Sequence, residues 1–108
     1  MAFDAYDRSL ALLRTLAPLL TRLSGFDPGL ADQLRRAAQS VVLNIAEGNR
    51  RAGKDRRNRF RCSLGSAAEV GSCLDVALAL AYIDEAAVAD ALALIDRIRA
   101  MTWRLANG

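Results

Sequence analysis

The residues best equipped for chemistry in this sequence are cationic groups crowded into one short segment. Between Arg35 and Arg61 the chain carries nine bases and two acids, a local net charge of +7, whereas the remainder carries six bases and ten acids. This polarity indicates an anionic partner for the segment more than a generally basic protein. Seven of the bases fall within twelve residues, and we predict that they bind nucleic acid: Arg50, Arg51, Lys54, Arg56, Arg57, Arg59 and Arg61.

The make-up of this cluster indicates the kind of binding. Guanidinium groups fork onto phosphate oxygens, and charges surrounding a helix end can meet a phosphate backbone from several directions. Phe60 is the only aromatic residue in the cluster, which argues against base-specific reading by stacking. We therefore expect salt-sensitive binding to RNA or DNA without strong sequence preference.

A second interpretation of the cluster stays open. The arginines can form a solvated turn that acids of an adjacent subunit neutralise, for example Asp84, Glu85 or Asp90. The protein would then be an interaction scaffold in which the arginine cluster holds subunits or a protein partner together.

Catalytic chemistry has few candidates. The chain contains no histidine, which removes imidazole bases and histidine metal ligands. Glu47 and Glu69 could form a carboxylate pair, but no nucleophile stands at a usable spacing, so we expect them to accept hydrogen bonds across helices. With Ser40, Asn44 and Ser66 they make up a predicted structural polar motif, in which Asn44 fixes helix register. The sequence predicts no enzyme activity, no metal site and no cofactor.

The two cysteines are further candidates for a chemical role. Cys62 and Cys73 stand eleven residues apart on one expected helix, roughly 16 Å along its axis, which is too far for a disulfide. We expect both to be small core residues and their free thiols to indicate a reducing, cytoplasmic setting.

No charge-free run approaches the roughly 20 residues that span a bilayer, and the acidic start does not resemble a signal peptide. Trp103 is expected to anchor packing at the bundle end or at a subunit contact.

The elements that position these residues are helices. The 108-residue chain is 53% hydrophobic and rich in Ala, Leu and Arg, which predicts one all-α domain over 1–108. Apolar periodicity predicts helices over about 4–23, 28–48, 54–83 and 84–106. Short connections favour an antiparallel up-down-up-down four-helix bundle.

Local signals refine these helices. Asp27 as N-cap and Pro28 at the first position mark the second start, and Gly48 is the expected end. Pro18 should kink or split the first helix, and the segment SGFDPG should separate it from the second. Arg56 stands where the apolar seam of the third helix should continue, so that helix should start in solvent or against a neighbouring subunit unless Arg56 is paired. The first helix has a predicted apolar stripe made of Tyr6, Leu10, Leu13, Ala17 and Leu20, widened by Leu16 and Leu23.

The motif NIAEG, followed by a basic loop and LGSAAEVGSCLDVA, resembles a family of four-helix-bundle proteins encoded by intervening sequences in bacterial 23S ribosomal RNA genes. Avd, the accessory protein of diversity-generating retroelements, is similar to them. RRAAQSVVLNIAEG resembles the second helix of the family, FRCSLGSAAEVGSCLDVALALAYID the third and ALALIDRIRAMTWRL the fourth. The loop NRRAGKDRRNRF departs from the family, because it has lost an aromatic-Gly-Arg start and an acidic-aromatic pair and has gained arginines.

The resemblance implies a ring-like homopentamer of four-helix bundles and no established enzymatic activity. The Avd-like branch binds nucleic acid and works with a reverse transcriptase. By that analogy we expect self-association, RNA or DNA, and a reverse transcriptase as partners of this chain.

Overall fold

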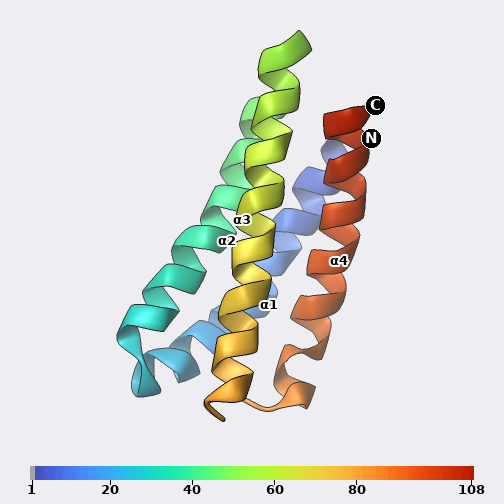
Figure 1. Cartoon of the computed structure of the whole chain (residues 1–108). Coiled ribbons are helices and arrows are strands. Elements are labelled where there is room, and N and C mark those ends of the chain that lie inside the picture. Colours follow the sequence, from blue (N-terminus) through green and yellow to red (C-terminus); the bar gives the residue numbers. More distant parts are fainter. Residues whose placement is uncertain (1) are drawn as a thin grey trace.

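A computed structural model describes residues 2–108, all of them in helices or short connections. The helices are α1 (Ala2–Phe26), α2 (Pro28–Asn49), α3 (Gly53–Ala79) and α4 (Glu85–Asn107), and no strand occurs among the described residues. Each helix packs on two neighbours, in the cyclic order α1, α2, α3, α4. They run alternately up and down, and the two chain ends lie side by side at one end of the bundle (Figure 1). The predicted four-helix bundle is confirmed.

The core is a column of aliphatic side chains closed by one aromatic ring. Phe60, Leu74 and Ile98 are among its largest fully buried members. α2 buries Leu34, Ala37, Val41 and Ile45, and α4 buries Val88, Ala91, Ile95 and Ile98. The molecule is elongated, 42 × 22 × 20 Å.

The stripe predicted for the first helix was wrong by one position. Its core line is Ala5, Ser9, Leu12, Leu16, Leu19 and Leu23, whereas Ala17 is exposed and Leu10 only partly buried. Leucines at many positions make the apolar arc of α1 wide, so periodicity alone does not fix its centre. Ser9 disguised the true centre, because its hydroxyl donates to the Tyr6 carbonyl at 2.7 Å and can therefore be buried.

Pro18 does not split α1, and the expected SGFDPG break is a single residue. Pro18 and Arg14 are exposed, so water can solvate the carbonyl that loses its helical partner. The helix continues to Phe26, and only Asp27 separates it from α2. The Asp27 carboxylate caps α2 by accepting from the Leu30 amide at 3.0 Å, with Pro28 next to it, as predicted.

Two helix ends differ from expectation. α2 runs past Gly48 to Asn49, so this glycine is no C-cap. α3 stops at Ala79, four residues before the predicted Ile83. It stops because Ala81 adopts a left-handed φ of 59°, from which the amides of Ala81 and Tyr82 return to the carbonyls of Leu78 and Ala77. That hydrogen-bond pattern terminates a helix.

α3 also contains a long apolar stretch. By length and composition alone it could cross a membrane, the only described helix that could, and 33% of its most apolar window is buried inside the bundle. A bundle helix passes the same test, so this is weak support for a membrane span. More relevant to function, α3 carries apolar residues on its outer side as well as toward the core.

Candidate nucleic-acid interface

The junction between α2 and α3 is built on a close helix contact. A Cβ on Gly48 would lie 2.6 Å from Cε1 of Phe60, so only glycine lets the Phe60 ring approach α2 this closely. Arg56 covers the same ring, with its guanidinium carbon 4.9 Å from the ring centroid, and donates to the Gly48 carbonyl at 3.1 Å. Arg56 is therefore engaged within the chain, as the alternative of a paired arginine required. The first turns of α3 also extend past the other helices, as expected (Figure 1).

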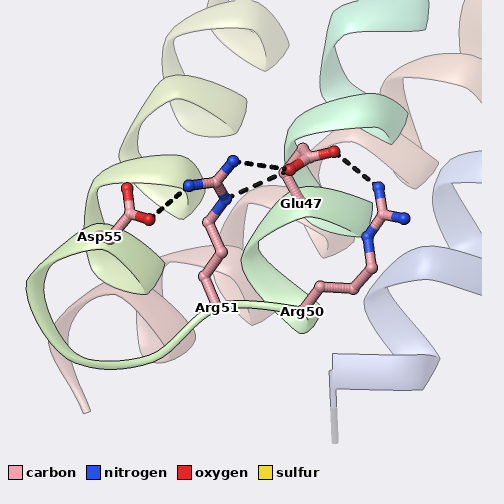
Figure 2. A network of polar contacts seen from close by, with 4 residues as sticks. All are labelled: Glu47, Arg50, Arg51 and Asp55. Carbon is pink, nitrogen blue, oxygen red and sulfur yellow. Dashed lines mark hydrogen bonds and ion pairs between the residues drawn. The ribbon is translucent and has the colours of Figure 1, made fainter.

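The short connection after α2 carries an exposed ion-pair network (Figure 2). Glu47 accepts from Arg50 at 2.6 Å and from Arg51 at 3.2 Å, and Arg51 also donates to Asp55 of α3 at 2.6 Å. Hydrogen bonds from Arg51 and then Arg50 lower the pKa of Glu47. The hydrogen bonds that Arg51 donates to Asp55 and then to Glu47 raise the pKa of Arg51. Arg51 thus ties the end of α2 to the start of α3, while the side chain of Arg50 stays 71% exposed.

The remaining cations of the predicted cluster are Lys54, Arg57, Arg59 and Arg61. None has an acidic partner among residues 2–108. Lys54 and Arg61 are exposed, Arg57 and Arg59 partly buried. Ala52, the N-cap of α3, offers no capping side chain, so the first amides of α3 add positive potential at the same place. This end of α3 can receive anions.

The structure brings together part of the predicted polar motif. The hydroxyls of Ser40 and Ser66 lie 2.7 Å apart across α2 and α3, and Asn44 donates to the Ser40 carbonyl at 3.0 Å and hydroxyl at 3.1 Å. Glu47 belongs instead to the arginine network, and Glu69 is exposed beside Ser40 and Ser66 without a hydrogen bond in the described part of the chain. No three of these or other described His, Cys, Asp or Glu residues gather in a way that could hold a metal ion.

The predicted polar motif left out Ser63, which is buried and donates across helices to the Val41 carbonyl at 2.9 Å. The signal was its place between Phe60 and Ala67, at the helical spacing of the core. Of the two cysteines, Cys73 is buried as expected but Cys62 is exposed. Burial, followed by the charge of Glu69, raises the pKa of Cys73.

Trp103 does not anchor packing within the chain, because it is 59% exposed. It lies in the last turns of α4, at the same end of the bundle as the start of α3 (Figure 1). Its exposure could have been predicted, because Trp103 directly follows Thr102 of the buried stripe of α4 and therefore points away from the core. This end of the bundle therefore carries an exposed aromatic ring that lies outside the sequence segment of the arginine cluster.

Charge is divided along the long axis of the bundle. Cutting each helix at its middle leaves twelve bases and four acids in the half that contains the start of α3, a net charge of +8. The other half, residues 15–38 and 67–96, contains three bases and eight acids, a net charge of −5. Folding thus extends the polarity of the sequence segment to a whole end of the molecule, called the basic end below.

Comparison with known proteins finds a matching family and a solved structure with a similar fold. The family model described as 23S rRNA-intervening sequence protein matches residues 2–104. A crystal structure from Bacteroides thetaiotaomicron VPI-5482, described as a protein with unknown function from the S23 ribosomal protein family, superposes with a TM-score of 0.87 at 19% sequence identity. The match covers 96% of this chain and 99% of that one, and at this identity it shows a common fold. No curated protein sequence matches the chain.

Proposed function

Because the chain belongs to the 23S rRNA-intervening sequence protein family, we propose that it is a non-enzymatic, homo-oligomeric helical bundle that binds RNA or DNA through its basic end. The observation that carries the proposal is the group of cations without acidic partners in the N-terminal part of α3: Lys54, Arg57, Arg59 and Arg61. Cations that no carboxylate neutralises are available to phosphate.

The geometry favours backbone contacts over base reading. Several guanidinium groups around one helix end can fork onto successive phosphates. No helix at this end is shaped as a separate recognition element, since α3 remains part of the bundle along most of its length (Figure 1). Sequence-tolerant, salt-sensitive binding follows from such contacts.

The assembly we propose is the ring-like homopentamer that the family resemblance implies. It is supported by an outer face of α3 that exposes small and apolar side chains, including Val76 at 44% exposure, and by Leu80, directly after the helix, at 53%. Gly65 on this face has no atom within 4 Å of a Cβ placed on it, so a neighbouring helix could approach closely there. Repetition around a ring would turn each basic end into part of one multivalent surface.

By analogy with Avd, we propose that the protein acts as an accessory protein of a reverse transcriptase. A protein that holds RNA or an RNA–DNA hybrid by its backbone suits that task, because the template changes sequence while its phosphates do not. This part of the proposal rests on the resemblance and not on a contact in the bundle.

Fluorescence polarisation with labelled RNA and DNA at two salt concentrations tests the nucleic-acid proposal. Replacing Lys54, Arg57 and Arg61 by alanine should weaken binding by about tenfold or more. It should also flatten the salt dependence by about one unit of slope for each phosphate that the variant no longer binds. Wild-type protein that binds neither nucleic acid at low salt would refute the proposal.

The matched control removes three arginines from the acidic half, Arg22, Arg35 and Arg36. It makes the same change in net charge and should leave most of the affinity intact, because the local field and not the total charge attracts the phosphates. Equal losses in both triple variants would contradict a defined site at the start of α3.

The second candidate function is the scaffold in which arginines hold protein surfaces together. Within the chain Arg51 already pairs with Glu47 and Asp55, and Arg56 with Gly48. The groups left for contacts with another protein surface are therefore the same cations without acidic partners. Light scattering separates the two, since a scaffold would change its mass when Lys54, Arg57 and Arg61 become alanine and a nucleic-acid-binding ring would not.

A further inference from the structure

Trp103 is the only tryptophan of the chain, and more than half of its surface is open to solvent. A large exposed aromatic ring on a small bundle is a recognised sign of a contact surface. Its carbonyl accepts from the Asn107 side chain at 2.9 Å, which holds the last turn of α4 together. The ring itself is held on a regular helix and not on a loose tail.

The ring stands level with the free cations of α3. Arg61 lies 18 residues before the end of α3 at Ala79, and Trp103 lies 18 residues after the start of α4 at Glu85. The two helices are antiparallel neighbours joined by one short turn. With the same rise per residue in both, Arg61 and Trp103 reach about the same height.

The side of α4 on which Trp103 lies is the one facing α3. Met101, Arg104 and Leu105 line a surface hollow with Asp4 of α1, which fixes the α1 side of α4. Trp103 projects from the opposite flank of the helix, as does Arg99 one turn earlier. Because α3 is the other neighbour of α4, both residues border the line between α3 and α4.

The matching side of α3 carries two of the free cations. Ser66 contacts Ser40 of α2, which fixes the α2 side of α3. Leu64 is partly buried on the opposite flank, and Arg57 lies two turns before it on that flank, with Arg61 beside it. Arg57, Arg61 and Arg99 therefore lie on the same side of the bundle as Trp103, within about one helical turn of its height.

We propose that the α3–α4 side of the basic end is a platform for single-stranded nucleic acid, on which one base stacks on Trp103 while Arg57, Arg61 and Arg99 hold the flanking phosphates. This inference rests on the proposed function and names its substrate class. A stacked ring among cations is the usual composition of single-strand sites, and it tolerates any base because every base has a π face. A duplex keeps its bases stacked inside and cannot use the ring.

Tryptophan fluorescence tests this directly, because Trp103 is the only tryptophan. The probes are a short oligouridine, an oligodeoxythymidine of the same length and an RNA duplex of that length. Either single strand, or both, should quench the emission at saturation, and the comparison of the two tells RNA from DNA. The duplex should bind by charge alone and leave the emission unchanged.

Trp103→Ala should weaken single-strand binding by about tenfold, the loss of one stacked base, and leave duplex binding unchanged. Trp103→Phe should recover most of it. The matched control is Phe26→Ala, because Phe26 is exposed to 63% but lies at the far end of the bundle. Far-ultraviolet circular dichroism verifies that each variant keeps its helices.

The outcomes separate this inference from the proposed function. If single strand and duplex bind equally and the emission does not change, the platform is refuted while nucleic-acid binding stands. If no probe binds at low salt, both are refuted. If Trp103→Ala changes the mass of the assembly in light scattering, the ring belongs to a subunit contact and the platform is refuted.

Discussion

Gly48 is the residue on which the geometry of the basic end depends most. Glycine at this position lets the Phe60 ring lie against the backbone of α2. Arg56 covers the ring and donates a hydrogen bond to the Gly48 carbonyl. The fully buried ring is therefore packed between the backbone of α2 and the Arg56 guanidinium.

Replacing Gly48 by alanine should destabilise the fold by about 1–3 kcal/mol, the range for overpacking a tight core contact. Urea denaturation followed by circular dichroism measures the change. Gly25→Ala is the control, because nothing lies within 4 Å of a Cβ at Gly25 in α1. That control should raise stability by roughly 0.5–1 kcal/mol. An equal effect of the two substitutions would show that Phe60 does not press on Gly48.

Ala81 offers the opposite change. Its left-handed backbone, with φ of 59°, costs energy for a residue with a Cβ and is natural for glycine. Ala81→Gly should raise the free energy of unfolding by about 1 kcal/mol and the melting temperature with it. Ala86→Gly, within the first turn of α4, should lower both. A lower melting temperature for the Ala81 variant would contradict the role of this turn as a strained helix stop.

At the scale of elements, an ion-pair network of Glu47, Arg50, Arg51 and Asp55 joins α2 to α3 and is called the clasp below. Since hydrogen bonds from Arg51 and Arg50 depress the pKa of Glu47, the clasp stabilises the fold above the ordinary pKa of a glutamate. That contribution is lost as the pH falls through the depressed value. The clasp is exposed, so salt should weaken it.

Carboxyl titration by NMR should therefore find Glu47 below its ordinary value of 4.5. Arg51→Ala should move that pKa upward, because it removes the largest of the lowering influences. Arg36→Ala removes an exposed arginine that pairs with Asp32 far from the clasp and should leave the Glu47 titration unchanged. A Glu47 pKa that does not respond to the loss of Arg51 would mean that the clasp does not form in solution.

The elements themselves were predictable wherever the signal was local. The Asp27–Pro28 start follows from hydrogen bonds and dihedral angles within one turn, and Asp84 caps α4 in the same way. Failures occurred where tertiary packing decides. Pro18 stays helical because the core holds both halves of α1, and Gly48 is a contact to a residue twelve positions away and not a helix stop.

In the candidate site, too, the local features were predictable from the sequence and the tertiary contacts were not. The segment rich in arginine is evident in the sequence, but Arg51 and Arg56 are engaged within the chain, and only the three-dimensional arrangement reveals this. Trp103 joins the basic end because α4 returns antiparallel to α3. The spacing of residues in the sequence does not predict, to within one helical turn, which residues of α4 lie level with the start of α3.

At the scale of the whole molecule, the outer face of α3 is the largest feature that the single chain leaves unexplained. Gly65 has open space where a side chain would stand, Val76 is exposed on the same side of the helix, and Leu80 is exposed directly after its end. A solvated helix has no reason to keep glycine there, since alanine is the better helix former. Contact with another subunit supplies the reason.

Gly65→Leu should therefore leave the bundle folded but break the proposed ring, because the added side chain fills the space that a neighbouring helix would occupy. Light scattering should show a smaller mass, with unchanged circular dichroism. Gly25→Leu, also at an exposed helical glycine with open space around it, should keep the mass of the wild type. An unchanged mass for Gly65→Leu would remove α3 from the subunit contact.

The same variant connects assembly to nucleic-acid binding. In a ring with one rotation axis every copy is equivalent, so the basic ends form a single surface and a long strand can engage several of them at once. Gly65→Leu changes no charge, yet it should weaken binding of a long RNA by tenfold or more, about the lower end of the gain from multivalency, while a strand that spans one basic end binds as before. Polarisation with labelled RNAs of two lengths measures the difference. Equal losses for both lengths would place Gly65 in the binding surface itself and separate recognition from assembly.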